Sequence, residues 1–351
     1  MPLDGVVPDV LVETKDMPEK EWLEWRRKGI GGSDAAAVLG ISPWRTARDL
    51  YYDKRGIVTL DNKDNWVQLE VGHLLEPLVA QIFERKTGLK VSKLEFMFQH
   101  HEHPWMLADI DYLVTFPDYS NGILEIKTTN YNAKDKWWYN GEEIVPPYYE
   151  AQGRHYMAVM NIDRVYFCCL YGNNEEEVII RKIDRDMAYE EELIAAEEDF
   201  WMNYVQKEVP PPFTENDGDL ILDTLERSIG PADVDAPAVL LEKGQAEQID
   251  AFLALQEQKS RLNAEVNRID KEMKRLQGLV VEKLGQSCTG IYTRGGETYT
   301  VTYNPTRRSS IRKDELALLK MEHPDIFNKY VTVSFGRRFN VKISQAAQQA
   351  A

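Results

Sequence analysis

The sequence is poor in the features that mark several common classes of protein. It has three cysteines in 351 residues, two of them adjacent at Cys168 and Cys169, which excludes a disulfide framework and a four-cysteine zinc or iron–sulfur site. It contains no run of 18 apolar residues, and its start, Met-Pro-Leu-Asp-Gly, lacks the basic and apolar regions of a signal peptide. We therefore expect a protein of a reducing cytoplasm, with no membrane partner.

Positive charge is also scarce, and it is unevenly distributed. The chain has 42 Lys and Arg against 58 Asp and Glu, which gives a net charge of −16 at pH 7. Residues 244–351 contain 17 basic and 12 acidic residues, a net charge of +5, so the rest of the chain carries −21. An acidic body disfavours non-specific binding of phosphates over a broad surface. Any nucleic-acid site must therefore be concentrated in a small area.

A β-hairpin is predicted near residue 117, and it carries the residues best suited to catalysis. Apolar, β-prone runs at 110–116 and 123–128 flank a turn rich in Pro, Asp, Ser, Asn and Gly. Because side chains alternate along a strand, Glu125 and Lys127 share one face of the second strand. Asp111 lies in the opposing strand, so the hairpin is expected to bring the three charged groups together.

These three side chains allow two interpretations. Asp111 and Glu125 on one sheet face can hold Mg²⁺ through carboxylate oxygens. Lys127 beside them can orient or deprotonate a water molecule, or neutralise charge that develops on a phosphate. The alternative is a cross-strand ion pair, which stabilises a sheet by about 0.2–1 kcal/mol. The pattern is short enough that these residues alone leave both interpretations open.

A glycine-rich turn follows a helix predicted at 18–28. It reads Gly-Ile-Gly-Gly-Ser-Asp over residues 29–34, and such a turn can present backbone N–H groups and a Ser hydroxyl to a phosphate. The basic side chains that end the preceding helix add positive charge. The alternative is a plain joint between two helices, with glycine at a C-cap and Ser33 at an N-cap.

Further helices and strands surround the hairpin. Residues 67–87 form an amphipathic helix with Glu76 in its middle, and this side chain is either solvated surface or a third carboxylate facing the hairpin. A helix at 148–160 carries Gln152, His155 and Tyr156 at one-turn spacing. Strands are expected at 91–99, 164–171 and 178–183, and a helix at 186–207. This order predicts a mixed α/β (α+β) architecture rather than a doubly wound βαβ repeat.

The chain is long enough for more than one domain. Three prolines at 210–212 end the first part, which gives a domain at 1–212 that begins with an irregular arm. Residues 213–243, rich in Asp, Pro and Gly, are predicted to be a linker. Residues 244–351 are predicted to form a long helix with a coiled-coil seam of about four heptads, followed by a small basic extension that contains strands.

Four blocks in the first domain resemble a known family. They are Arg27–Ser33, Gly72–Pro77, Asp111 with the later Glu125–Lys127, and Tyr149–Gln152. In this order they resemble the YqaJ-type viral recombinase family, the group of phage lambda exonuclease, within the PD-(D/E)xK nuclease superfamily. The resemblance covers about residues 20–210. It implies a restriction-endonuclease-like core, in which helices flank a mixed central sheet.

The resemblance also implies an activity and partners. Members related to lambda exonuclease are processive 5′→3′ exonucleases on linear double-stranded DNA that use Mg²⁺, for which Mn²⁺ is expected to substitute. They leave a 3′ single strand for a phage annealing protein, and they form a ring-shaped trimer around DNA. The corresponding location is the cytoplasm of a bacterial host. The role of residues 244–351 does not follow from the resemblance.

The family pattern assigns metal ligands by position. It implies Asp111 and Glu125 as the main ligands, helped by the carbonyl oxygen of Ile126. Glu76 would be an additional acidic residue near a second metal. An isoleucine precedes Asp111 where the superfamily often has proline, and Asp109 shares the same strand face, so both aspartates remain candidates.

The same pattern assigns the remaining site residues. Lys127 would position the attacking water, and Gln152 would support the active site. Arg27 and Ser33 would hold the 5′ phosphate of the DNA, which agrees with the anion-binding interpretation of the glycine turn.

Three other functions compete with the exonuclease. Two are nucleases of the same superfamily, namely an endonuclease and a helicase-associated nuclease, although the sequence has neither the four-cysteine pattern of some such relatives nor a P-loop. The third is a catalytically silent scaffold that binds an annealing protein through the coiled coil. The intact set of Asp111, Glu125 and Lys127 argues against the third.

Overall fold

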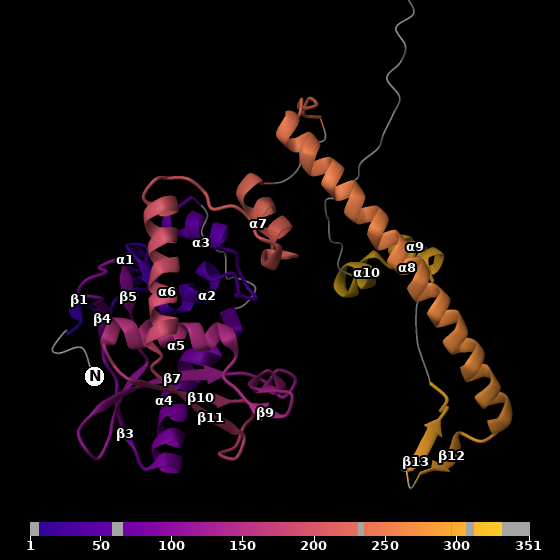
Figure 1. Ribbon diagram of the computed structural model, residues 1–351, viewed down its shortest axis with the longest axis horizontal. Coiled ribbons are helices and arrows are strands. Elements are labelled where there is room, and N and C mark those ends of the chain that lie inside the picture. The colour runs from indigo at the N-terminus through magenta and orange to yellow at the C-terminus, as the bar shows by residue number, and fades with distance from the viewer. Residues whose placement is uncertain (1–6, 58–65, 231–234, 296, 307–311, 332–351) are drawn as a thin grey trace, which may run out of the picture. The chain divides into compact units, whose positions relative to one another are not determined.

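The computed structural model describes residues 7–57, 66–230, 235–295, 297–306 and 312–331 (Figure 1). The chain divides into two compact units, Met1–Pro231 and Ala232–Ala351. No described helix has the length and hydropathy needed to cross a membrane.

The first unit contains both helices and strands. Its strands are β1 (Asp9–Glu13), β2 (Ile30–Gly31), β3 (Lys90–Ser92), β4 (Phe96–Gln99), β5 (Met106–Ala108), β6 (Tyr112–Thr115), β7 (Asn121–Thr128), β8 (Trp138–Tyr139), β9 (Glu142–Glu143), β10 (Arg164–Leu170) and β11 (Val178–Asp184). Its α-helices are α1 (Glu19–Arg26), α2 (Gly32–Val38), α3 (Ala47–Lys54), α4 (Trp66–Thr87), α5 (Pro147–Met160), α6 (Met187–Asp199) and α7 (Leu220–Ile229). Short 3₁₀ turns are η2 (Lys134–Trp137) and η4 (Glu215–Asp217), and α6 continues as a π-helix, η3 (Phe200–Val205).

A five-stranded sheet forms the centre of this unit, in the order β11-β10-β7-β6-β3. Strands β7 and β10 are parallel, and the other neighbouring pairs are antiparallel. The hairpin predicted from the sequence is β6–β7, and the second predicted hairpin is β10–β11. Both predictions are confirmed.

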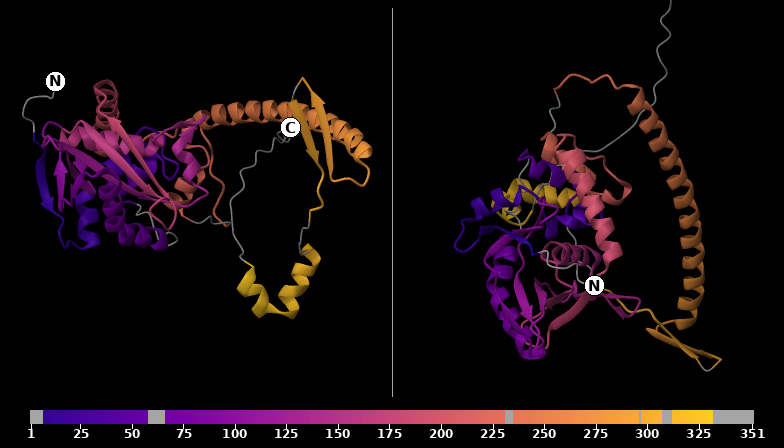
Figure 2. Two further views of the ribbon diagram at one scale, coloured as in Figure 1. Left: turned by 90° about the horizontal axis from the view of Figure 1, so that it is seen from below. Right: turned by 60° about the vertical axis from the view of Figure 1, so that its left-hand side comes forward.

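The sheet is covered on both faces, and the alternation along β7 decides which residue meets which helix. Leu124 and Ile126 lie in one apolar cluster with Phe83 of α4. Ile123 lies in a second cluster with Met157 of α5. Helices α4 and α5 therefore pack on opposite faces of the sheet (Figure 2). The predicted mixed α/β core with flanking helices is confirmed.

The first unit also contains a smaller sheet of four strands, in the order β1-β4-β5-β2. The prediction of one strand over 91–99 is wrong, because this segment divides into β3 and β4, which join different sheets. The prediction of an irregular arm before residue 16 is also wrong, because β1 pairs with β4. Residues 109–111 connect β5 of the smaller sheet to β6 of the larger one. This connection places two aspartates at the junction of the sheets.

The boundary of the first unit lies later than the sequence suggested. Residues 213–230, predicted as part of a linker, include helix α7, which is anchored to α3. Thr224 is buried, and its hydroxyl donates a hydrogen bond to Asp49 Oδ2 at 2.6 Å. Arg227 donates to Asp49 Oδ1 at 2.7 Å. These contacts make α7 part of the first unit.

The second unit begins with a long helix, α8 (Lys243–Leu284), and continues with a β-hairpin of β12 (Thr289–Arg294) and β13 (Glu297–Thr302). Two short helices follow, α9 (Lys313–Glu322) and α10 (Pro324–Tyr330). The apolar side chains of the predicted coiled-coil seam are exposed along α8. Much of the basic charge predicted for this extension falls on residues 307–311 and 332–351, which lie outside the described residues.

A buried ion pair ties α5 to α6 and to β5. His155 and Glu197 are both fully buried, with 2.8 Å between Nδ1 and Oε1. The other ring nitrogen lies 2.9 Å from the carbonyl oxygen of Leu107 and donates to it. Burial alone would lower the pKa of His155, but Glu197 and the Leu107 carbonyl outweigh burial and raise it. Burial also raises the pKa of Glu197.

Both shifts predict that this pair stabilises the fold less as pH rises. The contribution of a histidine with a raised pKa is complete below its unfolded pKa, near 6.5, and is lost as pH rises through the folded pKa. The raised pKa of Glu197 acts in the same direction.

Urea unfolding of wild type and of the double variant His155→Gln/Glu197→Gln should therefore show a difference in unfolding free energy that falls between pH 5 and pH 9. The fall should be about 1.4 kcal/mol for each unit of raised pKa. A difference that stays flat or grows with pH contradicts this assignment, and His101→Gln, at an exposed histidine, serves as the control.

Candidate active site

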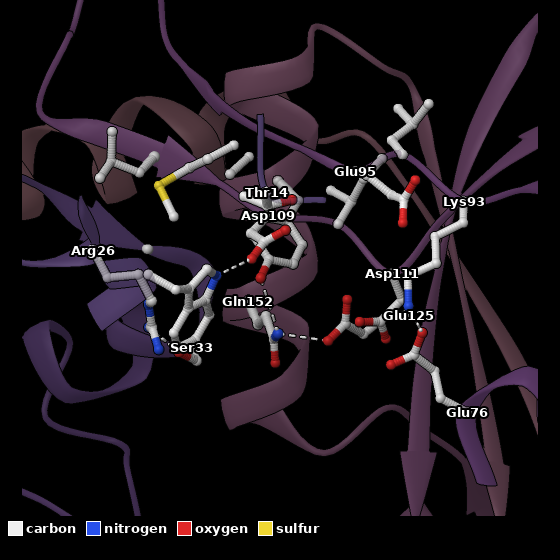
Figure 3. Close-up of a pocket in the computed structure, with 18 of the residues that line it drawn as sticks. Thr14, Arg26, Ser33, Glu76, Lys93, Glu95, Asp109, Asp111, Glu125 and Gln152 are labelled. Carbon is white, nitrogen blue, oxygen red and sulfur yellow. Dashed lines mark hydrogen bonds and ion pairs between the residues drawn. The ribbon is translucent and has the colours of Figure 1, made fainter. Parts of the chain in front are cut away.

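A cavity of about 550 Å³ opens where the two sheets of the first unit meet (Figure 3). Its lining includes five carboxylates and two cations, and the hydroxyl of Ser33 lies beside one of the cations; the charged residues are Glu76, Glu95, Asp109, Asp111, Glu125, Arg26 and Lys93. The cavity is therefore predominantly acidic, and its positive charge for a phosphate is confined, among the described residues, to Arg26 and Lys93.

The predicted acidic pair lies in this cavity. Asp111 directly precedes β6, and its Oδ2 accepts a hydrogen bond from the backbone N–H of Ile126 at 2.7 Å. Glu125 lies on the neighbouring strand β7 and is 3% exposed. The pairing of β6 with β7 thus holds both carboxylates at one edge of the cavity. The side chain of Ile126 packs on the α4 face of the sheet, so only its backbone faces the pair.

The two oxygens of Glu125 have different surroundings. Oε1 accepts hydrogen bonds from Lys127 Nζ at 2.7 Å and from Gln152 Nε2 at 2.6 Å. Lys127 also donates to Gln152 Oε1 at 3.1 Å, so the three side chains form a closed triangle. Oε2 is buried and has no hydrogen-bond partner among the residues that the structure describes. A buried carboxylate oxygen without a partner is costly, and this atom is therefore placed to receive a ligand.

The protonation of the site follows from burial and mutual repulsion. Burial and the facing Glu125 raise the pKa of Asp111 well above its usual value. Burial likewise raises the pKa of Glu125, against the opposing effect of Lys127. Burial would lower the pKa of Lys127, but Glu125 and Asp111 outweigh it and raise the pKa. Lys127 is therefore an ammonium group at neutral pH, which donates protons in hydrogen bonds and does not accept one.

The side chains of the cavity offer few ligands for a divalent cation. Within the part of the chain that the structure describes, no group of three or more His, Cys, Asp or Glu side chains is arranged to hold a metal ion. Two carboxylates with raised pKa values and the unpartnered Oε2 of Glu125 nevertheless fit a hard cation whose other ligands are backbone oxygen, water and substrate, as is usual for Mg²⁺. Asp111 and Glu125 are the residues that would hold it.

Glu76 lines the same cavity, but it does not join the acidic pair. Its Oε1 lies 2.8 Å from Lys93 Nζ (Figure 3). Lys93 belongs to the connection between β3 and β4, the segment that the sequence had suggested was one strand. The sequence therefore placed Glu76 correctly in the cavity but did not identify its partner.

The guanidinium group that faces the cavity is that of Arg26, and not that of the predicted Arg27. Arg26 donates a hydrogen bond to Ser33 Oγ at 2.7 Å, and both residues line the cavity. Arg27 instead lies 3.3 Å from Asp53 of α3 and is absent from the lining. Adjacent residues of a helix point about 100° apart, so only one of the two can face a given side.

One residue near Arg26, Trp22, was not recognised as part of the site. Trp22 donates its indole N–H to Asp109 Oδ2 at 2.6 Å, and the Arg26 guanidinium lies 4.9 Å from the Trp22 ring centre. The spacing of Trp22 and Arg26, four residues apart on α1, was the available signal, because such residues share a helix face. Asp109 is held by Trp22 rather than by the acidic pair, and burial raises its pKa.

The glycine turn is joined to the acidic pair by one aromatic side chain. A Cβ atom on Gly32 would lie 2.5 Å from the Tyr156 ring, so only glycine allows the turn to approach this closely. The Tyr156 hydroxyl lies 3.4 Å from Gln152 Nε2, which in turn holds Glu125. The Arg26–Ser33 side of the cavity and the carboxylate side therefore share a continuous line of contacts.

This contact predicts different outcomes for two glycine substitutions. Gly32→Ala should lower the unfolding free energy by about 1–3 kcal/mol, because the methyl group displaces a fully packed ring. Gly72→Ala is the matched control: it lies in α4, and its added Cβ would meet only Thr128 Oγ1 at 3.8 Å. That change should be neutral or stabilise by up to about 1 kcal/mol, the helix preference of Ala over Gly. Thermal and urea unfolding measure both, and equal losses would contradict the proposed contact with Tyr156.

Comparison with known sequences supports the resemblance found in the motifs. Residues 21–163 match the family model of the YqaJ-like viral recombinase domain. The uncharacterized protein YqaJ of Bacillus subtilis (strain 168) is 29% identical over 337 residues, which cover 95% of this chain and 97% of that protein. The predicted similarity to the YqaJ-type family is confirmed for this part of the chain.

Solved structures with partial similarity include two exonucleases. The alkaline exonuclease LHK-Exo from Laribacter hongkongensis is 20% identical with a TM-score of 0.44, over 54% of this chain and 93% of that chain. A phage related exonuclease from Haemophilus somnus 129PT is 13% identical with a TM-score of 0.33, over 53% of this chain and 99% of that chain.

Proposed function

We propose that this chain, which is similar to YqaJ-like viral recombinases over residues 21–163, is a metal-dependent nuclease that degrades one strand of linear double-stranded DNA. The observation that carries the proposal is the buried group of Asp111, Glu125 and Lys127, with one carboxylate oxygen unpartnered. In most buried ion pairs the polar atoms of both partners are hydrogen-bonded. A site that awaits a cation would leave one of them free, as here.

The side chains of the acidic pair, Gln152 and Lys127 have different roles in the proposed hydrolysis. A divalent cation between Asp111 and Glu125 would supply Lewis acidity and lower the pKa of water. Gln152 fixes the orientation of Glu125 and of the Lys127 ammonium group through two hydrogen bonds. Lys127 then donates to a water or to a phosphate oxygen at the cleavage site, where its charge offsets the negative charge that develops.

The other side of the cavity suits the terminal phosphate of the substrate. Arg26 and Ser33 are a charged and a neutral donor in contact with each other, and arginine binds phosphate through its planar fork of N–H groups. A phosphate held there would place the first internucleotide bond toward the carboxylates across the cavity. With a 5′-terminal phosphate in this position, cleavage would proceed from the 5′ end, which is the 5′→3′ direction that the resemblance to lambda exonuclease implies.

Removal of the ammonium group tests the catalytic part of the proposal. With Mg²⁺, wild type should degrade linear duplex DNA, and EDTA should stop it. Lys127→Ala should lower the rate by about 10²–10³-fold, as expected for loss of one stabilising donor, while binding of the duplex in EDTA is retained. Lys90→Ala, at an exposed lysine, is the control and should keep wild-type activity.

Covalently closed circular DNA separates the exonuclease from its alternatives. Circles should remain intact under conditions that degrade the linear form. Cleavage of circles would favour an endonuclease of the same superfamily. Full activity of Lys127→Ala would contradict the role assigned to Lys127. No activity of wild type with any divalent cation would contradict the catalytic proposal itself and favour a scaffold.

The two adjacent arginines test the phosphate anchor. Arg26→Ala should reduce the preference for a 5′-phosphorylated end over a 5′-hydroxyl end by about 10- to 100-fold, the value of one hydrogen bond to a charged group. Arg27→Ala should leave this preference unchanged, because Arg27 faces Asp53. Initial rates on the two ends, measured by release of labelled nucleotides, give the ratio. The opposite ranking of the two variants would restore Arg27 as the anchor.

Partners follow from the same activity. A 3′ single strand produced by this enzyme is a substrate for a phage single-strand annealing protein. A ring-shaped trimer around the duplex would keep an acidic protein on DNA by topology, where broad electrostatic attraction is absent. The setting of this activity would be the cytoplasm of a bacterial host.

A further inference from the structure

We propose that Asp34 is a positioning residue that holds the Arg26 guanidinium group in place for a 5′-terminal phosphate. This inference rests on the proposed function, and it extends the phosphate anchor from the two residues that face the cavity to a buried carboxylate behind them.

Asp34 is built into the turn that carries the anchor. It is 1% exposed, and its Oδ2 accepts a hydrogen bond from the backbone N–H of Gly31 at 3.0 Å. Its Oδ1 lies 3.3 Å from Arg26 Nη2, the same nitrogen that donates to Ser33 Oγ. One nitrogen of Arg26 is thus fixed between a hydroxyl at the cavity and a carboxylate behind it.

Asp34 also forms ion pairs with two further cations. Lys54 Nζ lies 2.7 Å from its Oδ2, and Arg45 forms an ion pair with its Oδ1. Burial would raise the pKa of Asp34, but Lys54, Arg45 and Arg26 outweigh burial and hold it well below its usual value. Arg26, Arg45 and Lys54 carry three positive charges around the single negative charge of Asp34. This cluster therefore keeps a net positive charge.

The position of Arg26 therefore depends on a charge that the substrate does not touch. Among the described residues that line the cavity, Arg26 and Lys93 carry the positive charge, and Asp34 and Arg45 do not belong to the lining. Without the Asp34 charge, Arg26, Arg45 and Lys54 would repel one another, and the guanidinium group would lose one of its two fixed acceptors. The anchor would then bind a terminal phosphate less well while the carboxylate pair stays intact.

The experiment measures binding and needs no catalysis. Short duplexes with a 5′-phosphate or a 5′-hydroxyl end, each labelled at the other terminus, are titrated in EDTA with wild type, Asp34→Asn and Asp53→Asn, and anisotropy gives the two dissociation constants. Asp53 is the matched control, because it pairs with Arg27 and Arg45 without a hydrogen bond to Arg26. The ratio of the two constants within one preparation is independent of the fraction of folded protein.

We expect Asp34→Asn to reduce the preference for the 5′-phosphate about tenfold, and Asp53→Asn to leave it within about twofold of wild type. The double variant Arg26→Ala/Asp34→Asn should match Arg26→Ala alone, because Asp34 acts through Arg26. Asp34→Glu, which keeps the charge, should restore part of the preference, and it provides the test if Asp34→Asn does not fold. An unchanged ratio in both Asp34 variants would overturn the inference and leave Asp34 a purely structural residue.

The outcome also separates this inference from the proposed function. If wild type and Arg26→Ala bind both ends equally, the phosphate anchor itself is wrong, whatever Asp34 does. If Arg26→Ala loses the preference and the Asp34 variants keep it, only the role of Asp34 is wrong. Nuclease assays with Mg²⁺ then report on the carboxylate pair independently of both results.

Discussion

The site depends on Glu125, a buried carboxylate with hydrogen bonds to one of its two oxygens. Strand β7 is covered on one face by α4 and on the other by α5, so a charged residue in its middle is necessarily removed from water. Glu125 is tolerated there because Lys127 and Gln152 both serve one of its oxygens. An ion of opposite charge at the second oxygen would complete the arrangement, and this requirement links the stability of the sheet to the chemistry of the cavity.

Sequence patterns predicted this part of the molecule well for a physical reason. A strand alternates its side chains strictly, so the spacing of Glu125 and Lys127 places both on one face, and the apolar residues between them identify the other. Helix α4 was equally clear, because its apolar residues recur at helical spacing, and α5 was predicted with Gln152, His155 and Tyr156 at one-turn spacing. Each of these inferences uses only neighbours along the chain, and the structure agrees with them.

The errors concern choices that neighbours along the chain do not decide. Arg26 and Arg27 are chemically identical, and only the orientation of α1 shows that Arg26 is the one that lines the cavity beside Ser33. The role of Arg27 in binding a phosphate stays a prediction. Glu76 was placed in the cavity, but its partner Lys93 comes from a loop whose path the sequence misjudged as a continuous strand. Helix α7 follows three prolines and lies in a stretch rich in Asp, Pro and Gly, so it was predicted to be part of a linker. Only its long-range bonds to Asp49 reveal that it packs.

The attachment of α7 has a consequence for how this chain can be divided. Helix α3 is anchored at its start by α7 through Asp49, and at its end it supplies Lys54, whose ammonium group reaches the turn beside the cavity. A fragment that stops at the prolines would lack Thr224 and Arg227, and the buried Asp49 would lose its hydrogen bonds to both. Helix α3, which carries Lys54, would then be held less firmly. The smallest piece able to stand alone with an intact cavity therefore extends through residue 230.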